Sequence, residues 1–235
     1  MDSVWSNSSE PDAYHFVIAL FFAVGFVVVR FYLDRFVFRR LALWLTNGAA
    51  QMKINEGTYA KVAKCSESMW KLTYYATVEA WILKIAYHEP WFRDTHYYFK
   101  GWPNQELKFI YGGSIVLALH DASDVFLEAA KVFKYSEREL GASVCFGFFA
   151  LSWLVLRLIF FPFCVIKTTS CISPEYVDLS QAHGTSLYYI INTMLLMLLM
   201  FHMYWWVLIC SMIMRQLKNR GKVGEDIRSD SEDDD

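Results

Sequence analysis

A series of long apolar stretches limits the folds that this chain can adopt. The first runs from Phe16 to Val29 without a charged residue and continues past Arg30 to Leu33. A helix needs about 20 such residues to cross the hydrocarbon core of a bilayer. Further stretches of suitable length carry some polar residues: Leu72–Tyr87, Phe109–Leu127, Ala142–Ile166 and Leu187–Met214. The sequence therefore predicts an all-α fold, a multi-pass transmembrane helical bundle with about five spans.

The distribution of basic residues predicts the orientation of the chain. No Lys or Arg precedes the first stretch, whereas Arg30 and Arg35 begin a basic segment that we expect to form a cytosolic loop. The leader is acidic where a cleaved signal peptide is basic, so we expect a signal anchor. Arg215 and Lys218 follow the last stretch. We expect a lumenal N-terminus and a cytosolic C-terminus, which require an odd number of spans.

Three regions follow from this arrangement. Residues 1–13 are a lumenal tail, 14–214 the transmembrane domain, and 215–235 a cytosolic, acidic, disordered tail. The sequon at Asn7 lies so close to the membrane that we expect it to be unused. Ser229 and Ser231 stand among acidic residues, a context that acidophilic kinases favour. An inert, solubilising tail is the alternative.

Composition excludes several other classes of protein. The formal net charge is −2, which gives no argument for a nucleic acid partner. The 5 cysteines are odd in number and include no CxxC pair. This argues against a disulfide framework and against a zinc site.

The most informative stretch is SIVLALHDASDVFLEAAK, residues 114–131, because it places ionisable groups inside a predicted span. On a helical wheel, Asp124, Glu128, Asp121 and Lys131 all fall within about 100° of His120. A charge at membrane depth costs about 2.5–3.5 kcal/mol, so such groups face a bundle interior or a wet cavity. The stretch is thus a candidate functional site.

Three interpretations of this stretch remain open from spacing alone. A histidine beside carboxylates can act as a general base, with an acid orienting the ring. The same groups could bind a divalent metal, although one histidine with loosely spaced carboxylates is no recognisable ligand pattern. The third interpretation is an amphipathic helix at the interface with solvated charges. We favour acid–base chemistry and expect no metal.

Two polar residues in other spans receive structural interpretations. His202, within MFHMYWW, is expected to form a hydrogen bond between helices. Arg157 is expected to snorkel to the interface or to pair with a carboxylate.

The run LALHDASDVFLEAAK, residues 117–131, resembles the C-terminal half of the signature motif of the ceramide synthases, a group of TLC-domain membrane proteins. ESMWKLTYYA, YHEPWFRDT, SWLVLRLIFFPF, the late HMYWW and the acidic tail are also similar. Together these blocks resemble a plant-type ceramide synthase from about residue 14 onward.

This resemblance implies a multi-pass enzyme of the endoplasmic reticulum membrane that acts in sphingolipid biosynthesis. Such an enzyme transfers a fatty acyl group from acyl-CoA to the amine of a sphingoid base and gives ceramide. It has membrane lipid around it, acyl-CoA as its co-substrate and no further cofactor. Mapped onto the motif, the catalytic residues are His120, Asp121 and Asp124.

One departure from the family pattern is large. The family motif begins with two adjacent histidines upstream of LHDxxDxxLE, and no two of the 6 histidines of this chain are adjacent. Only Phe109, Ile110 and Tyr111 separate GWPNQELK from GGSIVLALHD, where the family has a long stretch with two further spans. We therefore expect an internal segment to be missing and acyl transfer to be impaired.

Two alternatives to an impaired enzyme remain. The chain could be a non-catalytic partner or regulator of a full-length ceramide synthase, as a homo- or hetero-dimer. It could also be a lipid-binding or transport protein whose polar helix lines a path.

Overall fold

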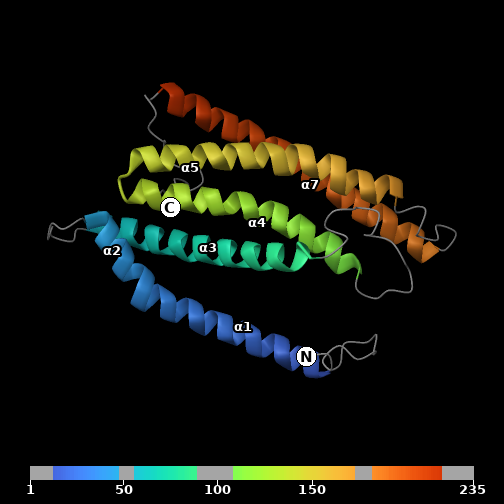
Figure 1. Ribbon diagram of the computed structural model, residues 1–235, viewed down its shortest axis with the longest axis horizontal. Coiled ribbons are helices and arrows are strands. Elements are labelled where there is room, and N and C mark those ends of the chain that lie inside the picture. Colours follow the sequence, from blue (N-terminus) through green and yellow to red (C-terminus); the bar gives the residue numbers. More distant parts are fainter. Residues whose placement is uncertain (1–12, 48–55, 89–107, 173–181, 219–235) are drawn as a thin grey trace. The chain divides into compact units, whose positions relative to one another are not determined.

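The computed structural model describes residues 13–47, 56–88, 108–172 and 182–218 (Figure 1). The regular structure in these ranges is helical throughout and includes no strand. This confirms the predicted all-α fold. The chain divides into two units, residues 1–70 and residues 71–235, which we describe separately. The sequon at Asn7 and the tail serines Ser229 and Ser231 lie outside the described residues.

The helices follow one another with few interruptions. In chain order they are α1 (Ala13–Leu33), the π-helix η1 (Asp34–Phe38), α2 (Arg39–Asn47), α3 (Glu56–Ala86), α4 (Lys108–Tyr135), α5 (Glu139–Ser152), the π-helices η4 (Trp153–Ile166) and η5 (Thr168–Ile172), and α7 (Ala182–Lys218).

Three helical stretches in the described ranges have the length and composition of a membrane span: Phe16–Thr46, Glu139–Ser170 and Tyr188–Lys218. The two more polar predicted spans, 72–87 and 109–127, fall in α3 and α4. Both helices are long enough to cross a bilayer, with 31 and 28 residues. The chain is thus a helical membrane protein. Its helices α3 and α4 are more polar than the three apolar stretches.

In the first unit, the helical backbone continues beyond Leu33, where the predicted span ends. Arg35, Arg39 and Arg40 belong to η1 and α2, so the prediction of a loop from Arg35 onward was wrong. The Asp34 carboxylate joins two parts of this unit, because it accepts hydrogen bonds from Arg39 Nε at 3.1 Å and from Ser66 Oγ of α3 at 2.5 Å. The segment contains neither Gly nor Pro before Asn47, and so nothing ends the helix earlier.

The second unit is built on a hairpin of α4 and α5. Glu137, between them, has a positive φ of 59°. The Arg138 N–H donates to Phe133 O at 3.0 Å, and the Glu137 N–H donates to Lys134 O at 3.0 Å. This is the Schellman pattern that closes a helix, with glutamate at the position where glycine is usual. Helix α5 therefore runs back along α4 directly after this turn.

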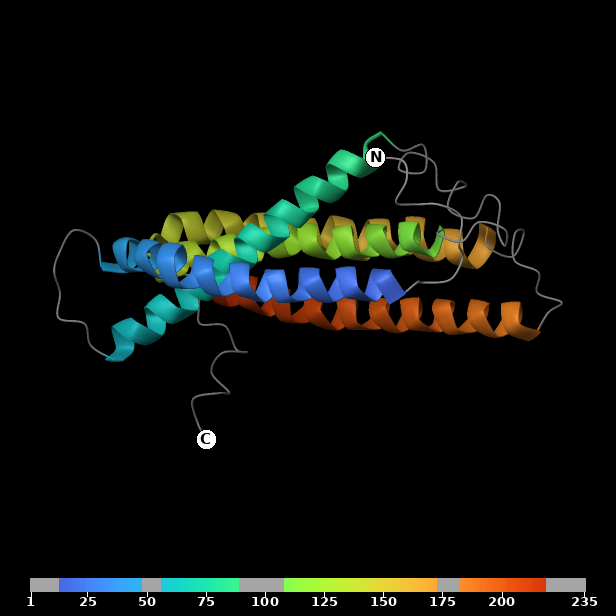
Figure 2. The same ribbon diagram turned by 90° about the horizontal axis from the view of Figure 1, so that it is seen from below.

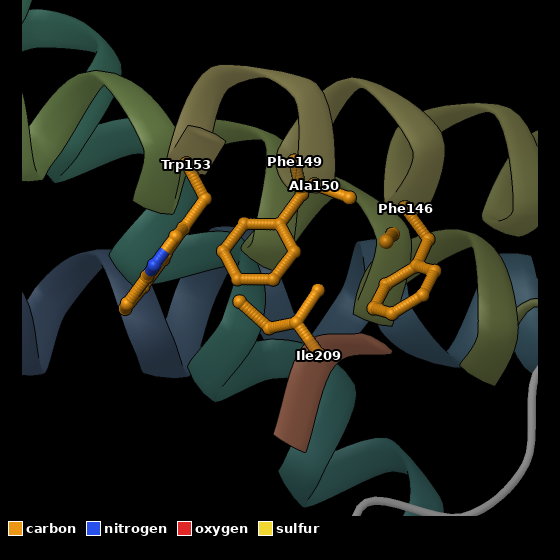
Figure 3. Packing of buried hydrophobic residues seen from close by; sticks show 6 residues of the cluster. Phe146, Phe149, Ala150, Trp153 and Ile209 are labelled. Atoms are coloured by element: carbon orange, nitrogen blue, oxygen red, sulfur yellow. The ribbon is translucent and has the colours of Figure 1, made fainter. Parts of the chain in front are cut away.

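The continuous helix of α5 and η4 packs against both α4 and α7; it runs alongside α4, and α7 crosses it at an angle in Figure 1 (see also Figure 2). Figure 3 shows how Phe146 and Phe149 of α5 and Trp153 of η4 point towards Ile209 of α7. Phe161, further along η4, is completely buried in a second cluster. These apolar contacts determine which faces of α4, η4 and α7 pack together.

Candidate functional site

The site lies where α4, η4 and α7 meet, and it begins with a pair of histidines. His120 of α4 and His202 of α7 bring their Nε2 atoms to 2.7 Å. The His202 side chain is only 2% exposed, and the edge of Phe161 packs against both rings. Two residues that are 82 positions apart in sequence thus share one hydrogen bond inside the bundle.

The hydrogen-bond partners determine where the protons of this pair reside. His120 Nδ1 lies 2.6 Å from Val116 O, one turn earlier in α4. A carbonyl oxygen only accepts, so Nδ1 carries the hydrogen and a neutral His120 has a bare Nε2. The short contact between the rings then requires that His202 Nε2 donates to His120 Nε2. A neutral His202 in this tautomer keeps its lone pair on Nδ1, and that atom is buried without a hydrogen-bond partner in the described residues.

Arg157 of η4 is the central cation of the site. Its Nη2 donates to Asp124 Oδ1 at 3.0 Å and to His120 O at 2.8 Å. The guanidinium carbon lies 3.8 Å from the centroid of the Trp153 ring, one turn earlier in the same helix. Arg157 is 5% exposed, and an ion pair, a carbonyl and an aromatic face offset part of the cost of removing its charge from water, while its Nε is buried without a partner among the described residues.

The other acidic groups of α4 differ in their surroundings. Glu128 is 4% exposed; one carboxylate oxygen accepts from Lys131 Nζ at 3.0 Å, and the other has no partner in the described ranges. Asp121 is half-buried and interacts through charge with Asp124 and Arg157. No hydrogen bond joins the Asp121 carboxylate to another residue in the described ranges.

Proline shapes the η4 side of the site. Pro162 stands inside the π-helix, where each N–H bonds to the carbonyl five residues earlier. Pro162 has no N–H, so the Arg157 carbonyl lacks this donor. The backbone carbonyl of Arg157 is also the one that interacts with the His202 ring. A carbonyl without its π-helical donor therefore interacts with the buried histidine.

The structure confirms the two interpretations of residues outside α4. His202 forms the expected hydrogen bond between helices, with His120. Arg157 forms the second of its two expected interactions, with Asp124. The polar face of α4 packs against η4 and α7 and is not a solvated interfacial surface. Among the described residues, no group of three or more His, Cys, Asp or Glu side chains is placed to hold a metal ion.

Sequence reasoning missed the identity of the partners. It placed His120, Asp121 and Asp124 in one site without His202, because α4 and α7 are far apart along the chain. The spacing of Trp153 and Arg157, four residues apart and followed by Pro162, was the available signal. Residues four apart lie on the same face of a helix, so this spacing predicts a cation stacked on an aromatic ring. Pro162 predicts an interruption of the backbone hydrogen bonds in the same helix.

Comparison with known proteins places these features in a family. Residues 107–211 match the family model described as TLC domain. Ceramide synthase LOH2 of Arabidopsis thaliana is 50% identical, and the match covers 100% of both chains. ASC1-like protein 3 of Oryza sativa subsp. japonica is 48% identical, over 93% of this chain and 95% of its own. Ceramide synthase LOH1 of Arabidopsis thaliana is 38% identical, over 98% and 95%.

The match to LOH2 is longer than this chain. It spans 295 positions, of which the 235 residues of this chain fill at most 235, so at least 60 positions are gaps in this chain. The two chains nevertheless match from end to end. The missing residues are therefore internal, in agreement with the departure that the sequence analysis describes.

Proposed function

Because this chain belongs to the ceramide synthases, TLC-domain membrane proteins, we propose that it carries part of the active site of a sphingoid base N-acyltransferase, with strongly impaired acyl transfer. The substrates of that reaction are acyl-CoA and a sphingoid base. The observation that carries the proposal is the cluster of His120, Asp124 and Arg157 between membrane helices, in a chain that lacks at least 60 positions of its relative.

Acyl transfer to a sphingoid base requires two chemical functions of the active site. The sphingoid amine is an ammonium ion at neutral pH and must lose a proton before it attacks, and the thioester carbonyl must be polarised. His120 is suited to the first task as part of a base. Asp121, whose carboxylate is free of hydrogen bonds to described residues, is suited to receive the ammonium group. Asp124 holds Arg157 in place beside them.

The impairment follows from what the chain lacks. The resemblance assigns the principal catalytic role to two adjacent histidines upstream of α4, and this chain has no such pair. Removal of an even number of crossings leaves the ends of the chain on their original sides. The site on α4 is then assembled without the residues that complete it. One of the two carboxylate oxygens of Glu128 is buried without a hydrogen-bond partner in the described residues, which is costly in a bundle interior.

An acyltransferase assay tests this function. The chain is expressed in cells without ceramide synthases of their own, beside an Asp121→Ala/Asp124→Ala double variant, and supplied with acyl-CoA and sphinganine. We expect ceramide close to the vector background from both. Ceramide well above background that the double variant loses would contradict the impairment and would assign catalysis to α4 alone.

We further propose that the chain resides in the endoplasmic reticulum membrane with its N-terminus lumenal and its C-terminus cytosolic. The support is the charge distribution: the first predicted span has basic residues only on its C-terminal side, and Arg215 and Lys218 follow the last. Protease protection of epitope tags in intact microsomes tests this. Protection of both tags, or of neither, would contradict the orientation.

The internal gap favours a second candidate function, as a partner of a complete ceramide synthase in a hetero-dimer. A chain that keeps most of the helices of its relatives keeps surfaces that could pack as theirs do. Co-purification with a tagged full-length synthase from detergent, together with a change in the turnover of that synthase, would support this role. Separate elution without any change in turnover would exclude it.

A further inference from the structure

We propose that His120 and His202 form a single proton-holding pair, in which His202 Nδ1 is the atom that takes up the proton. Its use in acylation rests on the proposed function, whereas the protonation states themselves do not. His202 then becomes a second histidine of the site, supplied by α7, and acts on the reaction through His120.

The neighbours of His120 fix its tautomer. Val116 O fixes the hydrogen on Nδ1, at 2.6 Å, and His202 Nε2 approaches Nε2 to 2.7 Å. Proton uptake directly on His120 Nε2 would place two N–H groups against each other. The pair avoids this when the added proton is taken up elsewhere.

The His202 ring provides that place. His202 Nδ1 is the remaining ring nitrogen of the pair that holds a lone pair without a hydrogen bond in the described geometry. The carbonyl beside the ring is that of Arg157, which Pro162 deprives of its donor within the π-helix. A proton on His202 Nδ1 would give this buried nitrogen a hydrogen to donate, and the acceptor that we assign to it is the Arg157 carbonyl, which interacts with the His202 ring. With this assignment, each of the four ring nitrogens of the protonated pair has a hydrogen-bond partner.

The positive charge of the protonated pair can lie on either ring. Once Nδ1 of His202 is protonated, the bridging hydrogen can move from His202 Nε2 to His120 Nε2, and the charge then lies on His120. Arg157 of η4 is the charged group that interacts with both histidines, and its cation opposes a second positive charge on the pair. The remaining charged and titratable groups interact with neighbours of the pair: Asp121 and Asp124 of α4 with Arg157, and Tyr75 and Glu79 of α3 with Asp121.

In acylation, the pair would take the proton of the sphingoid ammonium while the N–H electron pair stays on nitrogen. That nitrogen forms a bond to the thioester carbon, and the bond from this carbon to sulfur breaks. The second proton lost by the nitrogen goes to the coenzyme A thiolate, and the stored proton returns to water. The sum is one amide, one free thiol and one released proton.

Nitrogen-15 NMR of histidine-labelled protein in lipid bilayers tests the pair without requiring turnover. We expect a nitrogen–nitrogen correlation between the two Nε2 atoms, hydrogen on Nδ1 of His120, and a bare Nδ1 on His202. On acidification, Nδ1 of His202 should gain the proton while the correlation persists. Absence of the correlation, or hydrogen on Nε2 of His120 in the neutral state, would overturn the proposal.

Two variants sharpen this test. His202→Gln keeps an N–H that can donate to His120 Nε2 but removes the proton-accepting atom. We expect it to preserve the His120 tautomer and to abolish proton uptake by the pair in the pH range of the unaltered protein. His88→Gln, in the exposed turn after α3, is the matched control and should leave both spectra unchanged. Uptake of the proton by His120 in His202→Gln at the same pH as before would overturn the proposal. Failure of the acylation assay leaves these spectra intact, so the two proposals fail separately.

Discussion

At the scale of single residues, the site depends on the compensation of one buried cation. Arg157 is matched by an ion pair with Asp124, the His120 carbonyl and the face of Trp153. The sequence predicts that Arg157 seeks a carboxylate, because an unpaired charge is costly in a membrane. It does not predict which carboxylate, since Asp121, Asp124 and Glu128 all share the face of α4. The choice of Asp124 depends on how η4 packs against α4, which is a tertiary property.

Replacement of Arg157 tests this compensation. Arg157→Met leaves the Asp124 carboxylate without its ion-pair donor, whereas the His120 carbonyl keeps the hydrogen bond from Ser123 Oγ at 2.9 Å. Hydrogen bonds to charged groups contribute about 1.5–3 kcal/mol each. We expect the free energy of unfolding in detergent to fall by about 2–3 kcal/mol, with a smaller loss in Arg157→Lys, which keeps the charge. Arg138→Met, in the exposed turn before α5, is the control. A loss in Arg157→Met no greater than that in the control would contradict the central role of Arg157.

At the scale of elements, the sequence predicts helices well and their joins poorly. Continuous apolar stretches identify the helices, because the bilayer requires every backbone group to bond within its segment. The π-helical turns of η1 and η4 have no comparable signature, apart from Pro162 in η4. The turn at Glu137 was not predicted either, since a glycine is the usual signal for a positive φ and here a glutamate adopts it. Closure of the α4–α5 hairpin is therefore specified by packing.

Gly141 tests that packing, because it lies where α5 approaches α4. A Cβ at this position would lie 2.8 Å from Cδ1 of Phe133, a contact that forces the ring or the helix to move. We expect Gly141→Ala to lower the free energy of unfolding by about 1–3 kcal/mol. Gly147→Ala, with nothing within 4 Å of its Cβ, is the matched control and should cause no loss.

A second variant separates the clash from other effects of the alanine. Phe133→Leu gives the new methyl group more room, so the loss caused by Gly141→Ala should be smaller in that background. Equal losses in Gly141→Ala and Gly147→Ala, measured by the same unfolding titration, would show that close approach at Gly141 is not what the hairpin requires.

At the scale of the whole molecule, the chain matches LOH2 from end to end and yet lacks at least 60 internal positions. The sequence alone identified the family, because LHDxxDxxLE in a membrane helix and the surrounding blocks are specific. The sequence also indicated a departure from the family, because the adjacent histidines of the family motif are absent. It did not identify His202 as the partner of His120, since that contact joins helices at opposite ends of the second unit's sequence. We therefore propose that α4 carries part of an active site in a chain that lacks internal residues of its relative.

Restoration of the missing segment tests this account most directly. The residues that LOH2 has opposite the gap are inserted into this chain, and ceramide formation is measured in cells without ceramide synthases. The account predicts background activity from the unaltered chain, clear activity from the restored chain, and loss of that activity when Asp121 and Asp124 of the restored chain are both replaced by alanine. Equal ceramide formation by the unaltered and restored chains would contradict it, because acyl transfer would then not depend on the segment.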